Sequence, residues 1–214
     1  MATMPAATRL RQASVAEWFA TEQGRRLECI QTQAVFERLP QRPALPFLWL
    51  APHAGWPAQR PAMARVMCLH DTGAAWAGDL RGELPLPLLG ESFGTVVLQH
   101  PAREQALETL ADVHRLLLPG GVMWLLVGAA AHPARLLHPQ HRLWDAPAGG
   151  WRQALKQSSW HLRDVQRLGT TGLGLESASV LLEVEKRTVA PVGPRPTRRF
   201  VAQMASRSHC SKVT

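Results

Sequence analysis

A Pro-Gly-Gly turn between a helical and a strand-like apolar pattern constrains the fold of this chain more than any other feature. It lies within residues 92–127. The apolar, β-branched run 95–98 predicts a strand that is buried on both faces. Apolar residues recur at helical spacing over 106–117, and the turn at 119–121 ends that helix. Residues 122–127 form a second apolar run, so the stretch predicts a βαβ unit on a parallel sheet.

Other segments extend this unit into a larger α/β domain. The order of strands and helices predicts an open, mostly parallel α/β sheet in one domain of the 214-residue chain. Helices are predicted at 14–39, with a break near Gly24, and at 151–160. Strands are predicted at 46–51, 64–69, 75–80, 162–168 and 179–185.

The basic charge of the chain is concentrated near its end. The formal net charge is +8, but seven of the 24 basic residues lie from Lys186 onward, where no acidic residue occurs. The preceding 17 basic and 16 acidic residues nearly balance. We therefore predict a flexible segment at 1–13, a domain at 14–188 and a basic, disordered tail at 189–214. The charge of this tail favours weak electrostatic contact with nucleic acid.

Composition excludes several classes of protein. Three widely spaced cysteines fit neither a disulfide framework nor a metal site, so we expect a reducing, cytoplasmic environment and no bound metal. We expect no signal peptide, because residues 1–13 lack the pattern of one, and the longest apolar stretch is too short to span a membrane. Arginine greatly outnumbers lysine, and Asn and Tyr are absent, which is typical of a GC-rich, bacterial coding sequence.

The predicted site lies at one edge of the sheet. Ligands of doubly wound sheets bind at the carboxyl ends of the strands, where the strand order reverses. Polar residues follow several predicted strands at this edge, and those singled out are Asp71, Asp79, Gln99 and His100.

Residues 84–127 resemble the second half of class I S-adenosylmethionine (SAM)-dependent methyltransferases. The matching residues are Leu84-Pro85-Leu86-Pro87, Ser92-Phe93, Val96, His100, Leu110, Arg115, Leu118-Pro119 and Gly120-Gly121. The aspartate that commonly follows the phenylalanine in that family is Gly94 here. The resemblance covers residues 14–187 and implies a Rossmann-like sheet with helices on both faces and a C-terminal antiparallel hairpin.

The resemblance also implies a SAM site and assigns roles to its residues. The loop from Ala51 to Gly55 would hold the methionine part of SAM, and Asp71 would accept hydrogen bonds from the ribose hydroxyls. Asp79 would accept from the adenine amino group while Leu80 packs on the ring. Gln99 and His100 would line the meeting point of the methyl group and an unidentified acceptor. His100 would serve there as a general base or orient the acceptor.

The loop after the first strand departs from the family pattern. Its usual acid is replaced by Trp49, and two of its glycines are replaced by Ala51 and His53. Two hypotheses therefore remain open. The chain is a SAM-dependent methyltransferase, or it is a catalytically degenerate protein of the same fold that serves as a binding module.

Overall fold

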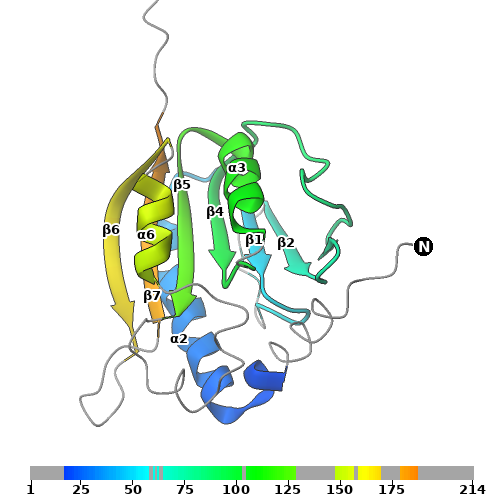
Figure 1. Ribbon diagram of the computed structural model, residues 1–214, viewed down its shortest axis with the longest axis vertical. Coiled ribbons are helices and arrows are strands. Elements are labelled where there is room, and N and C mark those ends of the chain that lie inside the picture. The colour runs from blue at the N-terminus through cyan, green and yellow to red at the C-terminus, as the bar shows by residue number, and fades with distance from the viewer. Residues whose placement is uncertain are drawn as a thin grey trace, which may run out of the picture.

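The computed structural model describes residues 17–57, 60, 62, 65–102, 105–128, 148–156, 159–169 and 179–187. The segment 1–13 and the tail 189–214 lie outside these ranges. The described residues form one seven-stranded sheet in the order β3-β2-β1-β4-β5-β7-β6, with helices packed against it (Figure 1).

The sheet is parallel at its centre and antiparallel at both sides. β1 pairs in parallel with β2 and β4, and β4 pairs in parallel with β5, whereas β7 is antiparallel to both β5 and β6. The predicted mostly parallel sheet and its C-terminal hairpin are therefore confirmed. The strands are β1 (Phe47–Ala51), β2 (Val66–Asp71), β3 (Trp76–Gly78), β4 (Phe93–Gln99), β5 (Leu117–Gly128), β6 (Trp160–Leu168) and β7 (Ser179–Lys186).

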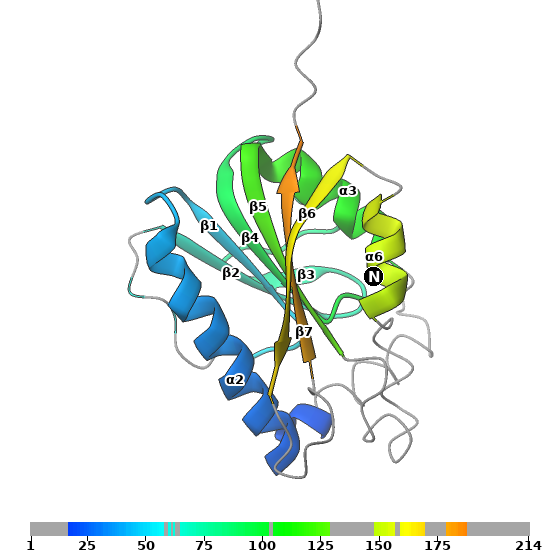
Figure 2. The same ribbon diagram turned by 90° about the vertical axis from the view of Figure 1, so that its left-hand side faces the viewer.

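Helices cover both faces of the sheet, as predicted (Figure 2). α2 (Glu22–Arg38) packs on one face, where Leu27 and Val35 join a buried cluster with Trp49 of β1. α3 (Ala106–Leu116) and α6 (Ala148–Lys156) pack on the other face. Burial of these opposed apolar faces supplies the main stabilisation of such a layered domain.

Several predicted boundaries differ from the structure. The break predicted near Gly24 in the helix 14–39 lies at Thr21, whose hydroxyl accepts a hydrogen bond from Gly24 N and caps the start of α2. Residues 17–20 form a separate helical turn before that cap. The helix predicted at 151–160 ends at Lys156, and Trp160 begins β6 instead.

β3 differs from the other strands of the first half because it is antiparallel to its neighbour β2. Only residues 72–75 separate the two strands, and Thr72 N donates to Ala75 O across this turn. So short a connection permits a hairpin but not a parallel crossover, which needs a dozen or more residues. The sequence alone did not indicate this direction.

An ion pair within α3, between the buried Asp112 and the partly exposed Arg115, also binds the segment that precedes β4. Asp112 in α3 is 5% exposed, and its carboxylate accepts from Leu86 N and from Arg115 Nε, each at 2.8 Å. Arg115 also donates to the carbonyls of Leu86 and Leu88. One guanidinium therefore satisfies a buried carboxylate and two backbone carbonyls. Arg115, in the last turn of α3 before the Pro-Gly-Gly sequence, therefore holds this helix against the segment that precedes β4.

Arg115→Ala should lower the free energy of unfolding by roughly 2–3 kcal/mol, because it leaves the Asp112 carboxylate buried without its cation. Urea denaturation measures this loss. The matched control is Arg26→Ala, which removes an exposed pair with Glu22 and should change stability by less than about 0.5 kcal/mol. Equal losses in the two variants would contradict the proposed role of Arg115.

Among the helices that the structure describes, none combines the length and the apolar character needed to cross a bilayer.

Candidate functional site

Parallel pairing brings the ends of β1, β2 and β4 to one edge of the sheet. Ala51 at the end of β1 pairs with His70 in β2, and the preceding Leu50 pairs with Leu98 in β4. Asp71 and Gln99 therefore lie one position further along the strands that flank β1. Neighbouring strands are about 4.8 Å apart, so these predicted residues form one contiguous edge.

Asp71 supplies a carboxylate at this edge. It is the last residue of β2 rather than part of the following loop, and it is 7% exposed. Its Oδ1 accepts a hydrogen bond of 2.6 Å from Gly73 N, which fixes the carboxylate against the turn to β3. A carboxylate held in this way has the acceptor geometry that neighbouring hydroxyl groups of a ligand require.

His70 adds a neutral imidazole beside this carboxylate. Burial lowers the pKa of His70, His53 lowers it further, and the Asp71 carboxylate opposes both effects. With its pKa held below the ordinary value of about 6.5, His70 is uncharged at neutral pH.

The loop after β1 carries Gly55 and contributes His53 and Trp56 to an aromatic cluster, which also comprises Phe19 and His100. Ring centroids of Phe19 lie 5.1 Å from His53, 4.5 Å from Trp56 and 5.6 Å from His100. Residues 17–20 thus close over the edge of the sheet. Gly55 has a φ of 87°, which favours glycine, and a Cβ there would meet no atom within 4 Å.

Trp49 occupies the position where the resemblance implies an acid. Its side chain is fully buried on the α2 face, and its indole Nε1 donates to Gln99 Oε1. The indole therefore links β1 to β4 in the interior. Because an indole offers only a donor, Trp49 cannot accept a hydrogen bond from the amino group of a ligand.

His100 follows β4 in a strained backbone conformation. Its φ is 44°, a left-handed value that is uncommon for residues other than glycine. The side chain is 2% exposed, and His100 N donates to Leu126 O at 2.9 Å, which ties this residue to β5. Such strain is often retained where side-chain direction matters for function.

Asp79 and Leu80 are not brought to this edge. Because β3 is antiparallel, Asp79 lies beside Cys68, three residues before the end of β2. Asp79 accepts from Cys68 N at 2.7 Å and forms a two-point ion pair with Arg60, at 2.8 and 3.2 Å. Leu80 packs against the apolar cluster on the α3 side. The structure therefore separates these two residues from Ala51, Asp71, Gln99 and His100.

The environment of Asp79 stabilises its charged form. Burial alone would raise its pKa, but the hydrogen bonds from Arg60 and Cys68 N and the positive charge of Arg60 outweigh burial and lower it. A carboxyl group with a lowered folded-state pKa stabilises the fold above its unfolded pKa of about 3.9. That stabilisation disappears as the pH falls through the folded-state pKa.

We expect Asp79→Asn to lower the free energy of unfolding by about 1 kcal/mol at neutral pH, because the ion pair with Arg60 is lost. The difference between wild type and variant should shrink below about pH 4, where wild-type Asp79 also becomes neutral. Urea denaturation across this pH range measures the effect. A difference that stays constant with pH would show that the Asp79 charge does not contribute.

Sequence reasoning missed Gln31, which contacts Gln99 and His100 of the predicted site, and Ser179, which contacts Gln31. Gln31 in α2 and Ser179 at the start of β7 are fully buried, and Gln31 Nε2 donates to Ser179 Oγ at 2.7 Å. A signal for Gln31 was present, because it is a polar residue in the apolar stripe formed by Leu27, Ala34 and Val35. No comparable signal marks Ser179, whose role depends on the pairing of β7 with β5.

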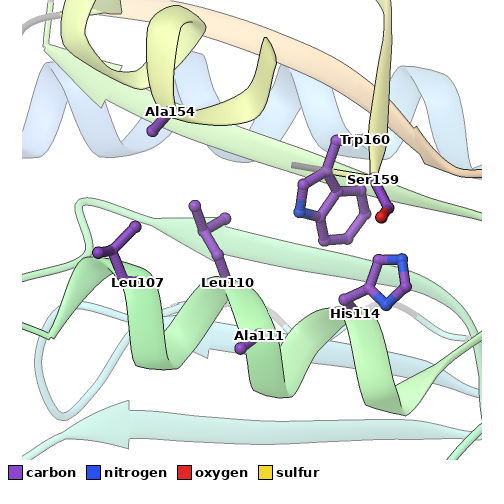
Figure 3. A pocket seen from close by; sticks show the side chains of 7 residues that line it. All are labelled: Leu107, Leu110, Ala111, His114, Ala154, Ser159 and Trp160. Carbon is purple, nitrogen blue, oxygen red and sulfur yellow. The ribbon is translucent and has the colours of Figure 1, made fainter. Parts of the chain in front are cut away.

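An apolar groove of about 270 Å³ lies between α3, α6 and the start of β6. Figure 3 shows the lining side chains of Leu107, Leu110, Ala111, His114, Ala154, Ser159 and Trp160 facing this space. The ring of His114 contacts that of Trp160 edge to face, with centroids 5.1 Å apart. None of the predicted site residues lines the groove, so it is separate from the edge described above.

Comparison with known proteins identifies the fold. NodS, an N-methyltransferase from Bradyrhizobium japonicum solved with S-adenosylhomocysteine (SAH), is similar with a TM-score of 0.56 and 12% identity, over 83% of this chain and 99% of that one. The 1,6-didemethyltoxoflavin-N1-methyltransferase of Burkholderia thailandensis, solved with bound 1,6-didemethyltoxoflavin and SAH, is similar with a TM-score of 0.53 and 15% identity, over 88% of this chain and 93% of that one. No protein-family model and no curated protein match the sequence.

The chain therefore has the fold of class I SAM-dependent methyltransferases, as the resemblance in residues 84–127 implied. At 12–15% sequence identity, these structural similarities show the fold alone. The activity has to be argued from the site.

Proposed function

We propose that this protein is a SAM-dependent methyltransferase that binds SAM at the edge formed by β1, β2 and β4. The observation that carries the proposal is the buried carboxylate of Asp71, held at the end of β2 one position beyond the residue that pairs with Ala51. The resemblance places a ribose-binding acid at this point of the fold. The carboxyl edge of the sheet is also where doubly wound folds bind nucleotides.

The residues at this edge fit parts of SAM unequally. Asp71 offers acceptor oxygens for ribose hydroxyls, and the open backbone at Gly55 leaves space for a ligand to approach the loop after β1. Trp49 provides no acceptor for the methionine amino group. The nucleoside part of SAM would thus be held mainly by Asp71, and the methionine part by the Ala51–Gly55 loop through its backbone.

SAM supplies an activated methyl group, so the protein needs chiefly to position the acceptor and exclude water. Residues 17–20 close over the edge, and Phe19 and Trp56 are both nearly fully buried there. These side chains would exclude water from the reaction centre. Gln99 and His100 would face the acceptor from the end of β4, where His100 is fixed by its bond to Leu126 O.

Calorimetric titration with SAM and with SAH tests this proposal. The expected result is binding to the wild type that weakens about ten- to hundredfold in Asp71→Asn, because ribose hydroxyls lose a charged acceptor. Asparagine keeps an oxygen for Gly73 N, so the turn itself should survive. The matched control is Asp79→Asn, in which the affinity for SAM should stay within about twofold because Asp79 lies away from the edge.

Equal weakening in Asp71→Asn and Asp79→Asn would contradict this assignment of the carboxylates. Absence of binding at millimolar SAM by a demonstrably folded wild-type protein would contradict the proposed function.

A non-catalytic binding module of the same fold is the second candidate. Two observations favour it, namely the replacement of the acid by Trp49 and the dense packing of the aromatic cluster at the loop after β1. If this packing is permanent, SAM and SAH will fail to bind. Successful titration followed by methyl transfer to an acceptor would exclude this candidate.

A further inference from the structure

A network of hydrogen bonds, here called the buried amide relay, connects four elements behind the proposed SAM site. It comprises Trp49 of β1, Gln99 and His100 at the end of β4, Gln31 of α2 and Ser179 of β7. Each of these side chains is 2% exposed or less. Water cannot freely replace their hydrogen bonds, so their donor and acceptor roles must agree with one another.

One end of the relay fixes the orientation of both amides. The indole nitrogen of Trp49 can only donate, so the atom of Gln99 that it contacts is the acceptor Oε1. The amide nitrogen of Gln99 then donates to Gln31 Oε1 at 3.2 Å. Consequently the amide nitrogen of Gln31 faces away from Gln99.

The other end of the relay gives the same orientation. Ser179 Oγ donates to the backbone carbonyl of Val127 at 2.9 Å, which leaves the hydroxyl oxygen as an acceptor. Gln31 Nε2 donates to that oxygen at 2.7 Å. A primary amide carries two hydrogens on its nitrogen, so Gln31 has a second hydrogen to donate.

That second hydrogen meets His100. The distance from Gln31 Nε2 to His100 Nε2 is 3.0 Å, and Gln31 Oε1 lies slightly further from the same ring nitrogen, at 3.2 Å. A proton on His100 Nε2 could reach Gln31 Oε1 at 3.2 Å, but it would also place an N–H group against the second Gln31 hydrogen, with the two nitrogens 3.0 Å apart. The arrangement is satisfied when His100 Nε2 accepts the Gln31 hydrogen through its lone pair.

We infer that Gln31 is a positioning residue that selects, for the imidazole of His100, the tautomer with its proton on Nδ1. While the relay is intact, His100 Nε2 is engaged and cannot take a proton from a methyl acceptor. His100 therefore orients the site rather than acting as a base through Nε2. This role in methyl transfer rests on the proposed function, whereas the tautomer itself does not.

Nitrogen-15 NMR of the labelled full chain tests the inference. A long-range proton–nitrogen correlation spectrum distinguishes protonated from unprotonated ring nitrogens, and the His100 signals are assigned by their loss in His100→Gln. At neutral pH the wild type should show unprotonated Nε2 and protonated Nδ1. A protonated Nε2, or signals averaged between the two tautomers, would overturn the inference.

Gln31→Glu reverses the chemistry at the same position. A carboxylate can only accept, so the Nε2 signal of His100 should change from unprotonated to protonated. The matched control is Gln23→Glu, an exposed change of the same kind on α2, which should leave the His100 signals unchanged. An unchanged His100 pattern in a folded Gln31→Glu protein would overturn the inference. The wild-type spectrum alone decides the tautomer if that variant does not fold.

SAM added to the same wild-type sample separates this inference from the proposed function. The inferred tautomer without SAM binding would refute the methyltransferase proposal and retain the relay. SAM binding with a protonated Nε2 would retain the proposal and refute the positioning role of Gln31.

Discussion

Parallel pairing of β1 between β2 and β4 is the constraint on which the rest of the structure depends. The registers of these strands place Ala51, Asp71 and Gln99 at one edge. The apolar centres of the strands bury both faces of the sheet, so a shift in register would expose core side chains as well as separate these residues. Packing of the core and assembly of the candidate site therefore depend on the same hydrogen-bond ladder.

The interior behind this edge is polar but internally satisfied. Trp49 takes the place of an acid and donates to Gln99, which continues through Gln31 to Ser179. At the position where the resemblance implies a ligand-binding acid, the chain thus has a hydrogen bond between strands. Buried amides of this kind also fix α2 in one orientation, because a displaced Gln31 would leave several groups without partners.

The sequence predicted the strands and helices that have continuous or periodic apolar runs. It did not predict the features that depend on a single connection or contact. β4, α3 and β5 were predictable from their periodicity. The predicted Pro-Gly-Gly turn was wrong, because α3 ends at Leu116 and residues 119–121 lie within β5, where the pairing with β4 shifts in register. The direction of β3 was not predictable, because it depends on the four-residue connection before Trp76. That direction moves Asp79 to an ion pair with Arg60, whereas Asp71 reaches the site edge. Gln31 contacts that edge from α2. This helix is distant from the edge residues in sequence and meets them only through the fold.

The central claim is that the edge formed by β1, β2 and β4 is a ligand site closed by residues 17–20. Chemical-shift mapping of the labelled protein during titration with SAH tests this most directly. The account predicts that shifts concentrate at Asp71, Gln99 and His100 and extend to Phe19, with the apolar groove at Leu107 and Ala111 unaffected. Shifts confined to that groove, or none in a folded protein at saturating SAH, would contradict it.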